Sequence, residues 1–301
     1  MIMDATNPRS KFSIVVGTTR ADGFKIFHRS LRLIRCPFHL IVSDASGKGY
    51  VESYKKSARI KSIERFTIIK DDPPSGFVRA YNTAFRMAET EWVLWLSDDC
   101  EILPDWDKKL MNFINENQNR DVIGAIYFLD PCWQTYRACS ANGFFFANYG
   151  VVKKEVGEKI GWFDERFEMY FADPAFGLQA QYLYGIPTVS IFGCRIKHSR
   201  SKHQAGEDVR NSVRDKDGVV FQEAYSEIGR KLKEKIGKAI VEVGMRSWHR
   251  RADLQKAFPA PQDEKCAFKL LPNFLAWMKQ YGVKEEPEIK DYFEKNPETA
   301  P

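Results

Sequence analysis

Two adjacent carboxylates, Asp98 and Asp99, follow directly after an unbroken apolar run in this sequence. The run at 92–96 reads Trp-Val-Leu-Trp-Leu, and such a run without alternation is typical of a strand covered on both faces in a parallel sheet. Ligands of such sheets bind at the carboxyl ends of the strands, where Mg²⁺ commonly lies between carboxylates and substrate phosphates. The pair therefore predicts a metal-bound phosphate ligand or, because Ser and Asp are ordinary turn residues, a simple turn that ends the strand.

The elements that must position these carboxylates alternate short apolar runs with amphipathic stretches, which is typical of repeated βα units. Strands are expected at 12–16, 39–42 and 66–69, and an amphipathic helix is expected at 76–89, just before the strand at 92. Each strand ends in small or acidic residues. The sequence therefore predicts one composite site along a single edge of an α/β sheet.

The next 100 residues continue this alternation. After Pro104 a helix is expected with Asp105 as its N-cap, and a further strand is expected at 122–128. Asp173-Pro174 opens another helix that Gly185 closes, because Pro is favoured at the first helical position and Gly just beyond the last.

The chain is expected to divide into three parts. Residues 1–200 form the α/β core, 201–226 form a mobile polar loop, and 227–301 form a helical C-terminal extension. The loop is expected because the sequence from 199 to 218 is polar, charged and without periodicity.

The composition excludes several classes of protein. With 44% hydrophobic and 29% charged residues over 301 positions, the chain matches a soluble globular protein with a sizeable core. Residues 1–11 lack the apolar segment of a signal peptide, and no apolar run reaches the length of about 18 residues that a membrane span needs, so we expect a cytoplasmic protein. Six scattered cysteines without a C-x-x-C pair predict reduced thiols rather than a zinc site.

Six pieces of the sequence stand in an order that is typical of one enzyme family. They are Gly17-Thr18-Thr19, Ile41-Val42-Ser43-Asp44-Ala45-Ser46, Gly76-Phe77-Val78-Arg79-Ala80-Tyr81-Asn82, Leu96-Ser97-Asp98-Asp99-Cys100-Glu101-Ile102-Leu103-Pro104, Gly161-Trp162-Phe163-Asp164-Glu165 with Asp173, and His198. With them the chain resembles, from about 12 to 198, the family 2 glycosyltransferases. These enzymes have the GT-A fold, a Rossmann-like and mostly parallel sheet flanked by helices, and transfer a sugar from a nucleotide donor.

The resemblance implies a nucleotide-sugar site. Asp44 stands where the family has a carboxylate that hydrogen-bonds the uracil or ribose of the donor, and an Asx-turn is its alternative role. Thr18 and Arg20 lie on the adjacent loop and are expected to line the base pocket. Asn82 and Asp98 are expected to complete the donor site.

The resemblance also implies a metal site for Mn²⁺ or Mg²⁺. Ser97-Asp98-Asp99 stands where the family has its D-x-D motif, and Asp99 matches the final carboxylate, which coordinates the ion on the diphosphate. Ser97 replaces the first carboxylate. His198 matches a family histidine that completes the metal or diphosphate site, and a solvated loop histidine is the alternative.

Asp173 corresponds to the general base of an inverting transfer, although an Asp before Pro174 is also a good N-cap. Ala172 and Ala175 replace acidic residues of the family pattern, which indicates either a divergent subgroup or lost activity.

The acceptor is expected to contact Asn142, Gly143 and Trp162. The resemblance thus implies an inverting, metal-dependent transfer from a nucleotide sugar, expected to be a UDP-sugar, to a hydroxyl of a glycan or lipid-linked acceptor.

Two alternatives stay open. One is a catalytically impaired relative that binds nucleotide sugars or glycans. The other is a sugar-phosphate nucleotidyltransferase, although Gly17-Thr18-Thr19-Arg20 is a poor match to the Gly-rich basic loop of that class.

The basic charge is concentrated in one segment beyond the resemblance. Residues 230–251 contain eight Lys or Arg and two Glu, so this segment alone accounts for the net charge of +6. A helix packed on the core with its charges in water and a helix lying on an anionic membrane both fit this pattern, and vesicle flotation separates them. Nucleic acid is not an expected partner, because no recognised nucleic-acid module accompanies the charge.

Overall fold

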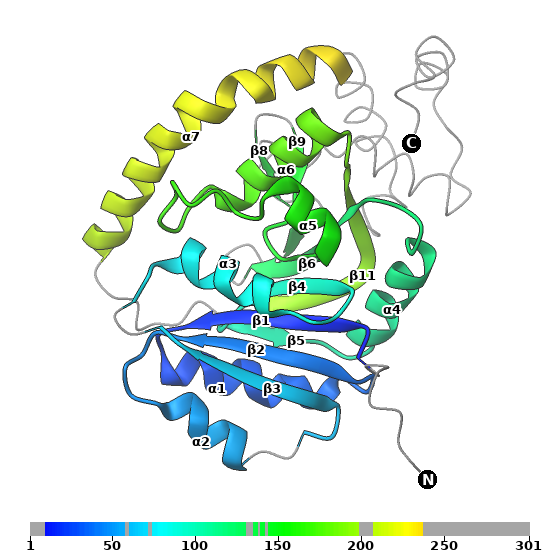
Figure 1. Ribbon diagram of the computed structural model, residues 1–301, viewed down its shortest axis with the longest axis vertical. Coiled ribbons are helices and arrows are strands. Elements are labelled where there is room, and N and C mark those ends of the chain that lie inside the picture. The colour runs from blue at the N-terminus through cyan, green and yellow to red at the C-terminus, as the bar shows by residue number, and fades with distance from the viewer. Residues whose placement is uncertain are drawn as a thin grey trace.

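The computed structural model describes residues 10–57, 60–71, 74–130, 135–137, 139–141, 144–198 and 207–236. Within these residues a nine-stranded mixed sheet runs in the order β3-β2-β1-β4-β10-β6-β11-β5, with β7 paired to β6 beside this path, and β8 and β9 form a separate pair (Figure 1). The strands are β1 Phe12–Thr18, β2 Phe38–Asp44, β3 Ile63–Lys70, β4 Trp92–Ser97, β5 Cys100–Ile102, β6 Ile123–Asp130, β7 Thr135–Arg137, β8 Cys139–Ala141, β9 Phe144–Phe146, β10 Gly150–Lys153 and β11 Thr188–His198.

Helices cover both faces of this sheet. They are α1 Ala21–Ser30, α2 Tyr50–Ser57, α3 Phe77–Met87, α4 Trp106–Glu116, α5 Lys154–Ile160, α6 Ala172–Tyr184 and α7 Glu207–Ile236, with a 3₁₀ turn, η1, at Leu31–Leu33. Side chains of α1, α2 and α4 pack in one core, and those of α3, α5 and α6 pack in the other. Helix α7 lies outside α6 and adds its side chains to this second core (Figure 1).

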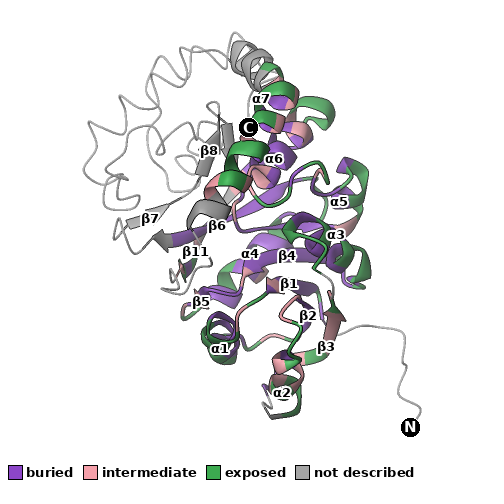
Figure 2. Ribbon diagram, turned by 90° about the vertical axis from the view of Figure 1, so that its left-hand side faces the viewer, coloured by how far each residue is buried: buried purple, intermediate pink, exposed green. Residues whose placement is uncertain are grey.

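The central strands are buried along almost their whole length (Figure 2). In β4, Leu94 packs in the core that contains α1, whereas Val93 and Trp95 pack in the core that contains α3. Both faces of the strand therefore need apolar side chains, which explains why the sequence shows an unbroken run rather than alternation.

Parallel pairing brings the ends of three strands to one edge. β1 pairs with both β2 and β4, and the register sets Thr18 opposite Asp44 and Gly17 opposite Ser97. The prediction that these strands end along a single edge of the sheet is therefore confirmed for the backbone.

The prediction of a mobile loop at 201–226 is wrong from Glu207 onward, because helix α7 begins at that residue. The buried side chains of this helix, Asp217, Phe221 and Tyr225, recur every four residues and form one narrow stripe. Because the carboxylate of Asp217 belongs to this stripe, it interrupts the apolar spacing that would predict a helix from the sequence. The α7 helix also takes up the first residues of the expected extension, and residues 237–301, with most of the basic segment, lie outside the described chain.

One expected cap is confirmed in position, and the other differs. Asp105 is the N-cap of α4, but it has a left-handed conformation and its side chain makes no capping hydrogen bond. The N-cap of α6 is Phe171, so Asp173 lies within the first turn of that helix and not at its cap. In the described part of the chain, every helix is either too short or too polar to span a bilayer.

Candidate functional site

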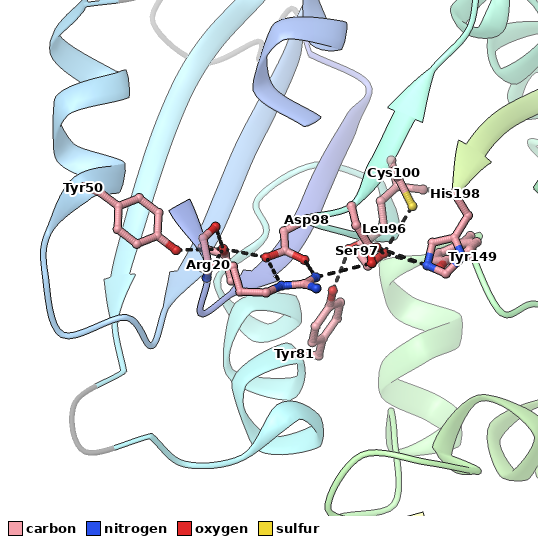
Figure 3. Close-up of polar contacts among 11 residues, drawn as sticks. Arg20, Tyr50, Tyr81, Leu96, Ser97, Asp98, Cys100, Tyr149 and His198 are labelled. Atoms are coloured by element: carbon pink, nitrogen blue, oxygen red, sulfur yellow. Dashed lines mark hydrogen bonds and ion pairs between the residues drawn. The ribbon is translucent and has the colours of Figure 1, made fainter. Parts of the chain in front are cut away.

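The turn after β4 holds two buried carboxylates, Asp98 and Asp99. Arg20, from the loop after β1, forms an ion pair with Asp98 Oδ1, and its Nη2 also lies 3.3 Å from Asp99 Oδ2 (Figure 3). The charge repulsion between the two carboxylates is thus offset by a guanidinium of the chain itself.

Asp98 connects this turn to the end of β1. The Thr18 hydroxyl donates a hydrogen bond of 2.8 Å to Asp98 Oδ2, and Arg20 Nε lies 3.4 Å from the same oxygen. Burial raises the pKa of Asp98, and the hydrogen bonds and charge of Arg20 counteract part of this rise. Three residues expected to bind the donor, Thr18, Arg20 and Asp98, therefore form one connected cluster.

Asp99, just before β5, faces His198 at the end of β11. The antiparallel register of β11 and β5 sets His198 opposite Cys100, and His198 Nε2 lies 3.2 Å from Asp99 Oδ1. The Ser97 hydroxyl donates a hydrogen bond to the same oxygen. Burial alone would raise the pKa of Asp99, but the hydrogen bond and charge of His198, with the Ser97 bond, lower it to about 2. His198 is therefore a half-buried strand residue beside Asp99 and not a solvated loop residue.

Asp44 lies on the same edge and is buried. Its Oδ1 accepts hydrogen bonds from the backbone N–H and the hydroxyl of Ser46, which is the Asx-turn that the sequence left open. These bonds use only one of the two carboxylate oxygens, so the turn and a contact to a ligand are compatible.

Asp173 is held by a residue that sequence reasoning missed. Asn148 Nδ2 donates a hydrogen bond of 2.7 Å to Asp173 Oδ2, and the Asn148 carbonyl accepts one of 3.1 Å from Trp95 Nε1. Burial raises the pKa of Asp173 to about 7, despite the opposing effect of the Asn148 bond. A general base works best when its pKa lies near the operating pH, and Asp173 meets that condition.

Tyr149, the residue after Asn148, reaches the other part of the site. Its hydroxyl lies 3.3 Å from Ser97 Oγ, and its ring lies 5.9 Å from the His198 ring (Figure 3). Two consecutive residues therefore join Asp173 to the Ser97-Asp99-His198 group. The one signal in the sequence was that Asn and Tyr interrupt the apolar residues between 144 and 152.

Asn82 does not belong to this site. It is 0% exposed, and its amide donates hydrogen bonds to the Phe163 carbonyl at 2.8 Å and to Glu165 Oε1 at 3.1 Å, while its Oδ1 accepts the Phe163 N–H. These bonds use the amide to hold the 163–165 segment against α3. The structure therefore assigns Asn82 to the core rather than to the donor site.

Trp162, which we expected to contact the acceptor, is also a core residue. It is buried and stacks on Phe85 with ring centroids 4.7 Å apart. A Cβ at Gly157 would lie within 2.2 Å of the indole, so the glycine makes room for the ring. Asn142 and Gly143 lie outside the described residues, so their expected acceptor contacts stay predictions.

Comparison with known proteins concerns the domain and the fold. The glycosyl transferase family 2 model matches residues 37–180. The mannosyltransferase PcManGT from Pyrobaculum calidifontis, solved with GDP-Man and Mn²⁺, is similar with a TM-score of 0.55 and 13% identity, covering 96% of this chain and 80% of that one. This likeness shows the fold.

The structure of S. aureus TarS matches with a TM-score of 0.49 and 16% identity, covering 82% of this chain. The chain spans only 50% of the length of that TarS structure. No curated protein sequence matches the chain significantly.

The matched residues 37–180 contain Asp44, Asp98 and Asp99 at this edge of the sheet and Asp173 in the first turn of α6. Residues 37–180 of the chain therefore match the glycosyl transferase family 2 domain, and the fold is GT-A.

Proposed function

We propose that the protein is an inverting glycosyltransferase that moves a sugar from a uridine diphosphate sugar to a hydroxyl of a glycan or lipid-linked acceptor. The observation that carries this proposal is the link from Asp173 through Asn148 and Tyr149 to the Ser97-Asp99-His198 group. Contact of residues 230–251 with an anionic membrane stays a prediction from the sequence.

Asp99 and His198 are suitably placed to be two ligands of one divalent ion. Neighbouring ligands of an octahedral ion with bonds of about 2.1 Å lie about 3 Å apart. Asp99 Oδ1 and His198 Nε2 are separated by 3.2 Å. The described residues contain no cluster of three or more ligating side chains, so diphosphate oxygens and water would complete the coordination. An imidazole ligand favours Mn²⁺ over Mg²⁺.

In the proposed reaction Asp173 takes the proton of the acceptor hydroxyl. The hydroxyl oxygen forms the new bond to the anomeric carbon, and the bond from that carbon to the diphosphate breaks with its electron pair leaving on the diphosphate. A bound divalent ion would neutralise charge on the departing group. Arg20 supplies a further positive charge at the same edge, an electrostatic contribution of the kind that is usually largest in catalysis.

A catalytically impaired binder is the second candidate, because three positions depart from the family pattern. Two of them have a structural reason, since Ala172 and Ala175 are buried in the core beneath α6, where a carboxylate would be unpaired. At the third, Ser97 keeps a polar role as a hydrogen-bond donor to Asp99. These departures are therefore compatible with an active site.

The proposal is tested by ligand binding and turnover. Uridine diphosphate with Mn²⁺ is expected to raise the melting temperature, since a ligand at 100 times its Kd stabilises the fold by about 2.7 kcal/mol. Guanosine diphosphate is the comparison ligand, because PcManGT holds GDP-Man. Release of uridine diphosphate from UDP-sugars then measures turnover.

Three outcomes of this experiment count against the proposal. Binding without turnover supports the second candidate. Consumption of a nucleoside triphosphate with a sugar phosphate supports a nucleotidyltransferase. Absence of any Mn²⁺-linked binding of a nucleoside diphosphate contradicts a nucleotide-sugar function altogether.

The pH dependence of turnover follows from the pKa of about 7 at Asp173. The base acts only when deprotonated, so kcat/KM is expected to rise as the pH increases through about 7. The stability of the fold should change in the opposite direction. Between about pH 4 and 7 the folded state keeps this proton whereas the unfolded state has lost it, so the free energy of unfolding decreases as the pH rises through that range.

Two measurements check these opposite trends. The first is the profile of kcat/KM against pH. The second is the difference in melting temperature between Asp173→Asn and wild type, and this difference is expected to shift in favour of the variant from pH 5 to pH 8. A flat rate profile between pH 6 and 8 would contradict the assignment.

A further inference from the structure

Asp217 on α7 is a carboxylate that is only 1% exposed. Its Oδ1 accepts the Glu168 N–H at 2.9 Å, and its Oδ2 accepts the N–H groups of Met169 at 2.9 Å and Tyr170 at 2.7 Å. Three successive backbone N–H groups that converge in this way form a nest, which is a concave site for an anion. Here helix α7 supplies the anion from 47 or more residues further along the chain.

The turn held by Asp217 leads directly into α6. The next residue, Phe171, is the N-cap of that helix with φ 65°, and Asp173 follows two residues later. The Ala175 N–H donates to the Phe171 carbonyl at 3.0 Å, which begins the helical hydrogen bonding. The position of this turn therefore sets the position of the first turn of α6.

Other contacts of the same turn are weaker. The Val78 N–H, at the start of α3, donates to the Glu168 carbonyl at 3.4 Å, and the Phe171 ring stacks on Phe221 of α7 with centroids 5.3 Å apart. Hydrogen bonds to a charged acceptor are stronger than those between neutral groups. Asp217 is thus the strongest polar restraint that the described contacts place on residues 168–170.

We propose that Asp217 is a positioning residue for catalysis, because it fixes the 168–170 turn so that α6 presents Asp173 to Asn148. This inference rests on the proposed function of Asp173 as the base. It makes α7 a required part of the catalytic domain rather than an appendage to it.

Asp217→Asn is the variant that tests the inference. Asparagine keeps the size of the side chain but has one acceptor oxygen, and its NH₂ group faces backbone N–H donors that it cannot satisfy. A misplacement of about 1 Å can cost about 10²-fold in rate, so kcat is expected to fall by about 10- to 100-fold. The Kd of uridine diphosphate with Mn²⁺ is expected to stay within about twofold, since the contacts of β1, β2 and β4 are unchanged.

Two matched variants on α7 serve as controls. Asp215→Asn removes an exposed carboxylate two residues away and is expected to leave kcat unchanged. Tyr225→Phe removes the contacts of the Tyr225 hydroxyl with Asp164 Oδ2 at 2.7 Å and with Gln179 Oε1 of α6 at 3.5 Å, so it weakens the packing of α7 on α6 but leaves the bonds to the 168–170 turn in place. Its kcat is expected to stay near wild type even where its melting temperature falls as far as that of Asp217→Asn.

The inference is overturned if Asp217→Asn keeps wild-type kcat, if kcat and donor affinity fall together, or if Tyr225→Phe loses as much kcat at equal stability. Should Asp217→Asn not be recovered folded, Asp217→Glu keeps both oxygens on a longer side chain, and the same selective loss of kcat is expected in a milder form. Wild-type protein that binds uridine diphosphate but turns over no sugar donor would instead count against the proposed function.

Discussion

Replacing Asp173 with asparagine is expected to lower kcat by about 10²- to 10⁴-fold, which is the usual contribution of a general base. The substitution keeps the shape of the side chain, and its carbonyl oxygen can still accept the hydrogen bond from Asn148 Nδ2. Only the capacity to take a proton is lost. The affinity for uridine diphosphate should therefore stay close to that of wild type.

Steady-state rates with a UDP-sugar and calorimetric titration with uridine diphosphate and Mn²⁺ measure the two effects separately. Asp121→Asn is a suitable control, because that carboxylate pairs with Lys159 on the surface at 3.4 Å and lies on neither part of the site. The remaining activity of Asp173→Asn should also lose the rise in rate near pH 7. Unchanged turnover would remove Asp173 from the role of base.

Replacing Asp99 with asparagine is expected to impair both binding and turnover, in contrast to Asp173→Asn. Asp99 is the carboxylate that faces His198, so its loss leaves the proposed ion with one neutral ligand from the chain. We expect Mn²⁺ to have no further effect on the affinity for uridine diphosphate, and kcat/KM to fall by about 10³-fold, since one electrostatic contact to developing charge can contribute 10²- to 10³-fold.

The measurement compares uridine diphosphate affinity with Mn²⁺ and with a chelator. Wild type should lose affinity when the ion is removed, and Asp99→Asn should show the same low affinity in both conditions. Asp105→Asn replaces an exposed carboxylate that is paired with Lys108 at 3.0 Å and lies beyond β5, and this variant is expected to behave as wild type. Mn²⁺-dependent binding by Asp99→Asn would show that the ion is held elsewhere.

A stability control is needed for Asp99→Asn. The pKa of Asp99 is lowered from 3.8 to about 2, so its ionised form stabilises the fold above about pH 4, and this contribution disappears as the pH falls toward 2. The variant is therefore expected to melt at a lower temperature at neutral pH, and binding should be measured well below that temperature.

The sequence by itself determined β1, β2, β3, β4 and β6 of the sheet and the edge on which the candidate site lies. The apolar run at 92–96 is followed by Asp98 and Asp99, and the strand at 38–44 ends in Asp44, because parallel strands buried on both faces are apolar along their length and change to polar residues at the edge where ligands bind. This information is local, so it survives in a single sequence. The order of the motifs also indicated the family that the match over residues 37–180 supports.

The tertiary structure decided which polar side chains meet. Arg20 pairs with carboxylates 78 and 79 residues away, and Asn148 contacts Asp173 across 25 residues. Asn82 and Trp162 belong to motifs that suggested ligand contacts, yet the packing of α3 against the 162–165 segment turns both into the core. Helix α7 was missed because Asp217 occupies a buried position of its stripe. Periodicity in the sequence indicates which face of a helix or strand is buried. The partner of a buried polar group depends instead on long-range packing, and the role of the group depends on that partner.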